Sequence, residues 1–311
     1  MSANPTNDTP TALLTGHNGF LGKYLDRGLV RAGYQVMRLG QTAGDMVCDL
    51  GTQQPDLSEE SFELVIHAAG KAHSVPRTES EKETFFRVNG DGTLRLLRAL
   101  DGSRVLPKAF VLISTVAVYG CEAGFSITED ISLMGKTPYA ESKIQAEQFV
   151  LNWCQQRGVR YLILRLPLIV GDAAPGNLGK LVETIRRGRY VRIGSGAARR
   201  SMVLAEDVAQ LIPKAVTVGG IYNLTDGVHP SVQELEEAIA RQAGRRLSWS
   251  VPYGVARVTA WAGDGINRVV GRRFPLDSIA LTKITSSLTF SDERARQQLG
   301  WKPKPVITYF S

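Results

Sequence analysis

The chain has 311 residues, of which 43% are hydrophobic and 22% charged, and its formal net charge is +7. These proportions are ordinary for a globular protein and argue against wholesale disorder. The three cysteines, Cys48, Cys121 and Cys154, are far apart and form no CxxC or Cys/His cluster. We therefore expect neither a disulfide framework nor a metal site, and a cytoplasmic location.

Residues 1–10 lack the basic and apolar regions of a signal peptide, and no segment has the length of a membrane span. We accordingly expect no membrane insertion. The positive charge is compatible with a merely basic surface, but it also favours a phosphorylated ligand. Arginines are dense between residues 186 and 200, yet no run of aromatic residues alternates with them, so nucleic acid is the least favoured partner.

In the first half of the chain, apolar segments alternate with amphipathic ones, a pattern typical of a parallel sheet with helices on both faces. Strands are predicted over residues 11–15, 35–39, 46–48, 64–68, 109–114 and 161–166. Helices are predicted over residues 20–32, 84–100 and 138–157. Pro138 in a first turn, and Gly33 and Gly158 after last turns, support these helix ends.

After Gly171 the sequence becomes rich in glycine, proline and arginine. A strand is predicted over residues 218–224, and helices over residues 231–243, 253–267 and 291–299. We interpret the whole as an α/β protein with a Rossmann-type, doubly wound parallel sheet and a smaller C-terminal lobe. Residues 1–171 would form the dinucleotide-binding domain, with residues 202–226 returning to it. Residues 172–201 and 227–311 would form the substrate-binding lobe.

A glycine-rich loop, Gly16-His17-Asn18-Gly19-Phe20-Leu21-Gly22, joins the first predicted strand to the first helix. Gly16 permits a tight turn, Gly19 lets a pyrophosphate approach the backbone, and Gly22 lets the helix pack closely on the strand. Phe20 and Leu21 open a helix whose free N–H groups face the phosphates. Because the loop follows a strand and opens a helix, it predicts a dinucleotide site and not an ordinary turn.

The second predicted strand ends without the acidic residue that usually binds the adenosine ribose of NAD. Arg38 lies nearby, and an arginine can pair with the 2′-phosphate of NADP. This favours NADP over NAD as the cofactor, unless Arg38 is simply solvated. Asp49 and Leu50, after the third strand, are candidate contacts for the adenine.

Tyr139 and Lys143 are four residues apart and share one face of the predicted helix. A nearby ammonium group is expected to lower the pKa of the phenol, which could then exchange a proton with a substrate oxygen while hydride moves at the same carbon. Alone, this spacing equally fits a surface pair. A hydroxyl at the end of the strand before it, Thr115 or alternatively Ser114, could hold the reacting oxygen.

Taken together, the glycine loop, His67-Ala68-Ala69-Gly70, Ser114 to Gly120 and the Tyr139/Lys143 pair resemble the extended short-chain dehydrogenase/reductases. Within that superfamily, the closest pattern is that of the NAD-dependent epimerase/dehydratase family acting on nucleotide sugars. The resemblance covers almost the whole chain and weakens after Gly227. It implies an enzyme with Thr115, Tyr139 and Lys143 as its catalytic triad.

The resemblance also assigns binding residues. It implies cofactor contacts at Gly16, Gly19, Phe20, Leu21, Gly22, Arg38, Asp49, Leu50, Ala68, Ala69, Gly70, Asn89, Ser114, Tyr139, Lys143 and Pro167. It implies substrate contacts at Lys71, His73, Thr115, Asn177 and Arg200, with Arg200 on the diphosphate. His73 could equally be an ordinary loop histidine. The predicted helices 84–100 and 138–157 would form a homodimer interface.

Two departures from the usual sequence pattern of this family narrow the range of expected reactions. Leu168 stands where many 4-epimerases have asparagine, and Val116 and Ala117 replace the Asp-Glu pair of 4,6-dehydratases. These features resemble the branch with 4-keto-sugar reductases and epimerases of bacterial surface-polysaccharide synthesis. We therefore expect hydride transfer at C4 of a nucleotide sugar. The alternatives are a reductase of a non-nucleotide carbonyl, such as a steroid or flavonoid-like ketone, and a non-catalytic dinucleotide sensor.

Overall fold

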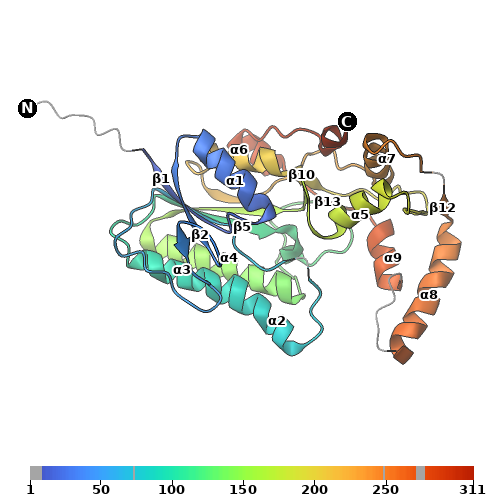
Figure 1. The fold of residues 1–311 in the computed structure, drawn as a ribbon, viewed down its shortest axis with the longest axis horizontal. Helices are drawn as coiled ribbons and strands as arrows, with labels where there is room; N and C mark the ends of the chain where they lie inside the picture. The colour runs from blue at the N-terminus through green and yellow to red at the C-terminus, as the bar shows by residue number, and fades with distance from the viewer. Residues whose placement is uncertain (1–8, 73, 248, 271–276) are drawn as a thin grey trace, which may run out of the picture.

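The computed structural model describes residues 9–72, 74–247, 249–270 and 277–311. At its centre lies a parallel seven-stranded sheet in the order β11-β7-β5-β4-β1-β2-β3 (Figure 1). The strands are β1 (Thr11–Thr15), β2 (Gln35–Gly40), β3 (Met46–Val47), β4 (Leu64–His67), β5 (Ala109–Thr115), β7 (Arg160–Leu166) and β11 (Gly220–Asn223). The predicted doubly wound α/β fold is confirmed.

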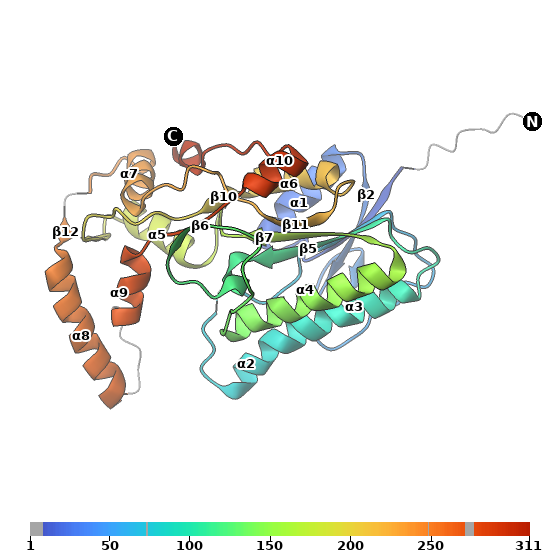
Figure 2. The ribbon, with the colours of Figure 1, turned by 180° about the vertical axis from the view of Figure 1, so that it is seen from behind.

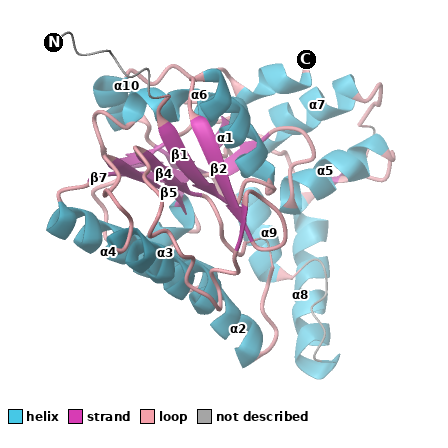
Figure 3. Ribbon diagram, turned by 60° about the vertical axis from the view of Figure 1, so that its left-hand side comes forward, coloured by secondary structure: helices cyan, strands magenta, loops and turns pink. Residues whose placement is uncertain are grey.

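Successive side chains of the central strands enter different cores, because neighbours on a strand point to opposite faces. Leu14 and Ile66 enter one core, whereas Leu13 and Val65 enter the other. The first core lies under α1 (Phe20–Arg31), α6 (Ala205–Ala215) and α10 (Glu293–Leu299). The second lies under α3 (Gly92–Asp101) and α4 (Pro138–Arg157), and α2 (Glu79–Phe85) and η1 (Phe86–Asp91) lead into α3 (Figure 3). Burial on both faces explains why these strands are almost continuously apolar.

The strand order reverses between β1 and β4, which are hydrogen-bonded neighbours. From β1 the chain moves outward to β2 and β3, and it then returns to β4 and continues to β5 and β7 on the other side. Open α/β sheets bind ligands in the crevice at the carboxyl ends of such strands. The fold therefore brings the residues after β1, β4, β5 and β7 to one edge.

The smaller lobe lies beyond that edge (Figures 1 and 2). It contains three two-stranded parallel pairs: β8 (Leu168–Val170) with β10 (Met202–Leu204), β9 (Arg192–Ile193) with β12 (Ser250–Val251), and β6 (Gly124–Ile127) with β13 (Leu288–Phe290). Its helices are α5 (Gly176–Arg186), α7 (Val232–Gln242), α8 (Tyr253–Val270) and α9 (Ser278–Thr285). Short helical turns are η2 (Val116–Tyr119) and η3 (Val306–Phe310). Within residues 202–226, α6 and β11 belong to the layers of the main sheet.

One predicted helix, over residues 84–100, is built differently. It begins earlier, at Glu79, because the Thr78 side chain accepts a hydrogen bond from the Glu81 amide. Residues Phe86–Asp91 then form a π-helical segment before α3. Wide turns of this kind are rare and are frequent at functional sites. Here the wide turn carries the buried Asn89.

A buried ion pair joins the central sheet to α4. Arg165 on β7 donates to Glu147 at 2.7 Å, and their side chains are only 5% and 1% exposed. The Ser114 hydroxyl also donates to Glu147, while Arg165 donates to the Tyr119 hydroxyl at 3.1 Å. Each charge is thus hydrogen-bonded on several sides, which a buried ion requires.

We expect Glu147→Gln to lower the free energy of unfolding by about 3 kcal/mol, because Arg165 would keep its charge in a dry site without a counter-ion. Urea-induced unfolding followed by circular dichroism measures this. Glu183→Gln is the matched control, since Glu183 pairs with Arg187 on the surface of α5 at 2.5 Å. We expect the control to cost less than about 0.5 kcal/mol. Equal losses in the two variants would contradict the role assigned to the buried pair.

Candidate active site

The glycine loop turns sharply at the end of β1. Gly16 has φ 74°, and a Cβ atom there would lie 2.6 Å from the Ala69 amide nitrogen. A Cβ atom on Gly22 would lie 1.9 Å from the Gly16 carbonyl oxygen. Gly19 is the N-cap of α1 and provides no side-chain cap to the first turn. The loop therefore leaves a helix N-terminus uncovered for an anion, as a dinucleotide phosphate requires.

Two adjoining hollows meet at this loop and share Gly16, Gly19 and Ala68–Lys71. The outer hollow, about 430 Å³, runs from the loop to Asp49 and Leu50. The inner hollow, about 470 Å³, runs to Thr115, Tyr139, Lys143 and Pro167. Together they form one elongated depression along the carboxyl ends of β1, β4 and β5. Its uncovered helix end and side-chain-free glycines fit an extended dinucleotide.

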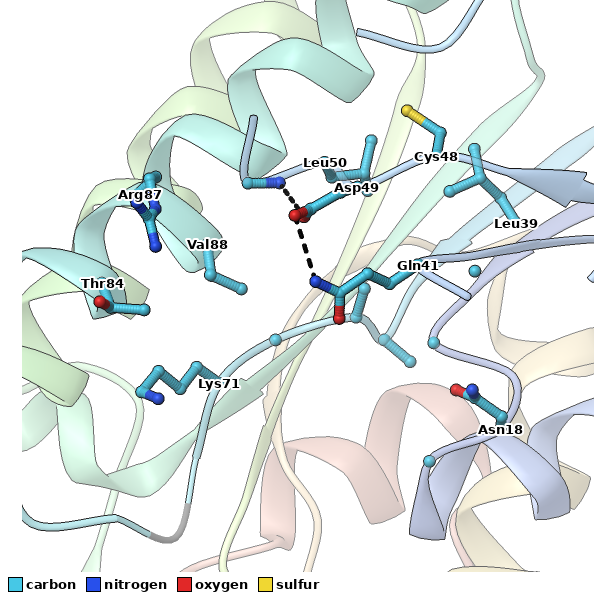
Figure 4. Close-up of a pocket in the computed structure, with 17 residues that line it drawn as sticks. Asn18, Leu39, Gln41, Cys48, Asp49, Leu50, Lys71, Thr84, Arg87 and Val88 are labelled. Atoms are coloured by element: carbon cyan, nitrogen blue, oxygen red, sulfur yellow. Dashed lines mark hydrogen bonds between the residues drawn. The ribbon is translucent and has the colours of Figure 1, made fainter. Parts of the chain in front are cut away.

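The outer hollow is bounded by two groups of side chains. Figure 4 shows Lys71, Thr84 and Arg87 on one side, and Asn18 and Gln41 on the other. The Gln41 amide donates to Asp49 at 3.1 Å, and the same carboxylate accepts the Gly51 N–H at 2.9 Å. Asp49 is therefore held by two donors in the outer hollow, which Tyr139 does not line.

Arg38, predicted to bind a 2′-phosphate, is not among the residues that line either hollow. Its guanidinium donates to Asp26 at 2.8 Å and lies 3.4 Å from Asp45. Hydrogen bonding to Asp26 raises the pKa of Arg38, so its charge is already matched by acids. Arg38 would have to leave these two carboxylates in order to reach a cofactor phosphate.

A chain of buried hydrogen bonds ties the two hollows together. The Ala69 N–H donates to the Thr15 hydroxyl at 3.1 Å, which lies 2.7 Å from Nδ1 of His67. The other ring nitrogen, Nε2, is 2.9 Å from the Thr93 hydroxyl, and that hydroxyl donates to the Asn89 carbonyl at 2.6 Å. Since Thr93 uses its only proton for Asn89, Nε2 must be the protonated nitrogen of His67. Burial, followed by the charge of Lys143, lowers the pKa of His67 to about 3, which keeps the ring neutral.

Asn89 extends this chain to both hollows. Its side-chain oxygen accepts the Lys71 N–H at 2.7 Å, and its amide donates to the Lys71 carbonyl and the Ser142 hydroxyl. Ser142 in turn donates to the Tyr139 carbonyl at 2.8 Å. Asn89 therefore fixes the loop after β4 and the first turn of α4 at the same time.

Thr115, Tyr139 and Lys143 all line the inner hollow. The Lys143 ammonium donates to the Ile113 carbonyl at 2.6 Å. Burial lowers the pKa of Lys143 to about 8, and the charge of Glu147 opposes this shift. The predicted triad residues thus lie in one place, although they come from the end of β5 and the first two turns of α4.

The prediction that Lys143 lowers the pKa of the phenol was wrong for this structure. Burial raises the pKa of Tyr139 instead, and only its hydrogen bond with the Thr115 side chain acts in the other direction. The physical reason is that a phenolate loses its hydration in the hollow, a loss that outweighs the stabilisation it receives there. The phenol is consequently neutral at pH 7.

Ser114, the alternative to Thr115, uses its hydroxyl differently. It lines the inner hollow but donates its proton to Glu147 in the core. Thr115 caps η2 by accepting the Ala117 N–H at 3.2 Å and also bonds Tyr139. Of the two hydroxyls, Thr115 is the one joined to the phenol.

The predicted substrate residues are scattered. Lys71 lies between the two hollows, with its ammonium 5.6 Å from the centre of the Phe85 ring. Asn177 belongs to the first turn of α5, and neither hollow is lined by it, although Pro175 lines the inner one. Arg200 donates to the Ser286 and Lys283 carbonyls at the end of α9. His73 lies outside the described residues.

Several lining residues were missed from the sequence. Asn18, Gln41, Thr84 and Arg87 border the outer hollow, and Ile113 and Ile169 border the inner one. Arg87 and its neighbour Val88 both line the outer hollow from the wide turn, which a regular helical pattern does not reveal. Within the described part of the chain, no group of three His, Cys, Asp or Glu side chains could hold a metal ion.

Comparison with known proteins agrees with this geometry. A family model described as "NAD dependent epimerase/dehydratase family" matches residues 12–225. UDP-glucose 4-epimerase of Vibrio cholerae is 26% identical over 314 aligned residues, covering 95% of this chain and 91% of that protein. GDP-6-deoxy-D-mannose reductase of Pseudomonas aeruginosa is 28% identical over 252 residues, covering 75% of this chain and 80% of that protein.

Similarity also extends to a relative with a different type of substrate and to a solved structure. The 4-hydroxy-2-methyl-3-oxo-4-farnesyl-3,4-dihydroquinoline-1-oxide ketoreductase of Stigmatella aurantiaca is 27% identical over 309 residues, 93% of this chain and 90% of that protein. The structure of RMD from Pseudomonas aeruginosa complexed with NADPH superposes with a TM-score of 0.70 at 25% identity, covering 97% of both chains. These similarities extend over both lobes.

The low pKa of Lys143 predicts a pH-dependent stability difference. Between pH 8 and 10.5 the unfolded chain holds a proton that native Lys143 has released, so the stability of the wild type rises with pH in this window. Below pH 8, burying the ammonium costs on the order of 3 kcal/mol. We expect Lys143→Met to melt a few degrees above the wild type at pH 7, and this advantage to shrink by pH 10.

Differential scanning calorimetry at both pH values measures the difference. Lys82→Met is the matched control, because Lys82 is exposed on α2 and forms a surface pair with Glu79. We expect the control to change the melting temperature equally at both pH values. A Lys143→Met variant that is less stable than the wild type at pH 7 would show that the ammonium stabilises its site.

Proposed function

Since the chain belongs to the NAD-dependent epimerase/dehydratase family of enzymes, we propose that it catalyses hydride transfer at C4 of a nucleoside-diphosphate sugar. The observation that carries this proposal is the inner hollow, where Thr115, Tyr139 and Lys143 lie next to the glycine loop. Relatives named UDP-glucose 4-epimerase and GDP-6-deoxy-D-mannose reductase support a nucleotide sugar as substrate. The cofactor is a nicotinamide dinucleotide.

In the proposed reaction, Tyr139 handles the proton. When bound, the nicotinamide supplies or removes the hydride at C4. As C4 of a keto-sugar gains hydride, the carbonyl electron pair moves to its oxygen, which takes the phenolic proton of Tyr139. The Thr115 hydroxyl, already bonded to the phenol, is placed to hold the same oxygen. Lys143, one turn along α4, lines the same hollow and is held there by the Ile113 carbonyl.

We infer that the 4-keto-sugar reductase direction is favoured over 4-epimerisation. The end of β2 lacks the acid that would hold NAD permanently, so NADPH would bind and leave in each turnover, as a reductase requires. Leu168, in the place of the asparagine of many 4-epimerases, lines the inner hollow.

We keep NADP(H) as the favoured cofactor, on one argument only. The end of β2 has neutral residues, Leu39, Gly40 and Gln41, where NAD-specific enzymes carry an acid. Arg38 gives less support than its position in the sequence suggested, because Asp26 and Asp45 already bind it. Arg200 likewise would bind a substrate diphosphate only after releasing the carbonyls at the end of α9.

The proposal also covers the use of the product, the location of the enzyme and its oligomeric state. The product would be a sugar donor for surface-polysaccharide synthesis, made in the cytoplasm. A homodimer would form through α2, α3 and α4, which lie side by side on one face of the sheet (Figure 2). Their apolar side chains are already used in the core, since the large exposed hydrophobic residues of the described chain include none from these helices. A dimer there would consequently rest on polar contacts.

Tyr139→Phe tests the catalytic assignment. We expect kcat to fall by about 10³-fold, because the variant has no proton to give to the reacting oxygen. Cofactor affinity, measured by fluorescence titration with NADPH, should stay within about twofold. Tyr161→Phe, which removes a hydroxyl from β7 outside both hollows, is the control and should retain wild-type turnover. A Tyr139→Phe enzyme with undiminished kcat would exclude Tyr139 as the acid.

Substrate and cofactor classes are separated by one set of assays. We expect the purified protein to oxidise NADPH in the presence of a UDP-4-keto-sugar and to leave an apolar ketone unreduced. The ketoreductase relative makes the apolar ketone a necessary comparison. Mass spectrometry of the nucleotide released on denaturation distinguishes the two reactions, since tightly retained NAD would favour an epimerase. Reduction of the apolar ketone alone would overturn the nucleotide-sugar assignment.

A further inference from the structure

Helix α8 projects from the outer end of the smaller lobe, where it forms a hairpin with α9 (Figures 1 and 2). Its packed side is made of small residues. Ala256 and Ala260 are buried against Leu281 of α9, in a cluster that includes Val251 and Ile193. These two alanines are four residues apart and so lie on the same side of the helix.

The opposite side of α8 is apolar and exposed. Val255 and Val258 are three residues apart and lie away from the two alanines, and Trp261 follows one turn later with 60% of its surface exposed. Among the described side chains of α8, three polar residues are exposed: Tyr253, Arg257 and Thr259. A surface helix normally presents polar residues to water, so an apolar outer side indicates a covering partner.

The type of apolar residue is informative. The chain has four tryptophans, of which Trp153 and Trp301 are buried in the two cores of the main sheet. The other two, Trp249 and Trp261, are exposed at the two sides of the β12–α8 junction, Trp249 by 80%. Tyr253 at the start of α8 is also exposed. Tryptophan and tyrosine favour the boundary between water and lipid, because their rings have one apolar and one polar part.

Arginines lie at the ends of α5 and α7, the helices that precede β9 and β12, and this strand pair leads into α8. Arg245 donates to the Arg186 carbonyl at 3.2 Å, which joins the ends of α5 and α7. Arg246 lines the same surface depression as Arg245. On α8 itself, the Arg257 guanidinium lies 5.2 Å from the centre of the Trp261 ring.

The acids of α5 and α7 in this region are paired with arginines, and Asp264 on α8 accepts the Ser278 hydroxyl at 2.6 Å. Glu183 pairs with Arg187, and Glu236 and Glu237 pair with Arg192. None of the salt bridges of the described residues includes Arg186, Arg245, Arg246 or Arg257. This end of the lobe therefore carries surplus positive charge beside an apolar helix side.

We propose that this α8 surface binds the headgroup region of an anionic membrane, without crossing it. The α8 surface is defined as Trp249, Tyr253, Val255, Val258 and Trp261, with Arg257 of the same helix and Arg186, Arg245 and Arg246 at the ends of α5 and α7. An apolar helix side flanked by arginines lies in the membrane plane, with its side chains below the headgroups and its charges on the lipid phosphates. No helix of the described chain is long and apolar enough to span a bilayer.

A second copy of the chain is a less suitable partner. In a symmetric dimer through α8, both copies would bring the same arginine-rich surface into one interface. That arrangement brings like charges together, whereas an anionic lipid surface neutralises them. No residue of the α8 surface lines the outer or inner hollow, so this proposal is independent of the proposed reaction.

Vesicle co-sedimentation of the full chain tests the proposal. We expect binding to vesicles of phosphatidylcholine with phosphatidylglycerol, and at least about tenfold weaker binding to phosphatidylcholine alone. Val258→Ser/Trp261→Ser should weaken binding to the anionic vesicles about tenfold or more, as should Arg245→Glu/Arg246→Glu. Tryptophan emission should shift to the blue on binding in the wild type and not in a Trp249→Phe/Trp261→Phe variant.

Matched controls carry the same changes elsewhere. Phe125→Ser/Val105→Ser removes exposed hydrophobic residues from other surfaces, and Arg98→Glu/Lys302→Glu makes the same change in net charge. Both should bind vesicles as the wild type does. Wild-type protein that ignores anionic vesicles, or variants that all bind equally, would overturn the proposal. So would a dimer, seen by analytical ultracentrifugation, that Val258→Ser/Trp261→Ser dissociates while vesicle binding is unchanged.

Discussion

The geometry of the site depends on a hydrogen-bond chain through five buried residues, Thr15, His67, Thr93, Asn89 and Ser142, in which Asn89 takes part with both its backbone carbonyl and its side chain. They come from β1, β4, α3, the wide turn before it and α4. Each donor finds one acceptor only if His67 is neutral and protonated on Nε2. The chain therefore fixes the spacing between the glycine loop, the loop after β4 and Tyr139. A buried polar network of this kind makes one arrangement much more favourable than its alternatives.

The buried ammonium of Lys143 lies next to this hydrogen-bond chain and lowers the stability of the folded protein. Lys143 is buried one turn before Glu147, which also binds Arg165 and Ser114. The carboxylate thus partly compensates two cations, and the ammonium remains near the hollow although its pKa falls to about 8. A lysine poised near neutral pH, beside a protonated phenol, forms a site ready to release a proton to a substrate oxygen. Stability and activity therefore place opposite demands on Lys143.

Sequence periodicity and helix-end residues were enough to predict the central strands and α4, whose bounds agree with the structure. Loop glycines were equally informative, because Gly16 and Gly22 leave no room for a Cβ atom. Two properties could not be predicted from the sequence, because they depend on residues that folding places nearby. Arg38 is bound by Asp26, and burial raises the pKa of Tyr139. The wide turn at Asn89 could not be predicted either, because a continuous α-helix has nearly the same pattern of apolar residues.

Transfer of an isotope label tests the central claim most directly, namely that the inner hollow brings a nicotinamide and C4 of a sugar together. The protein would be given NADPH deuterated at the transferable position of the ring, together with a UDP-4-keto-sugar, in a single turnover. Mass spectrometry and NMR would then locate the deuterium. Our account predicts one deuterium at C4 of the product sugar. A reduced sugar without deuterium at C4, or label found at another carbon, would contradict it.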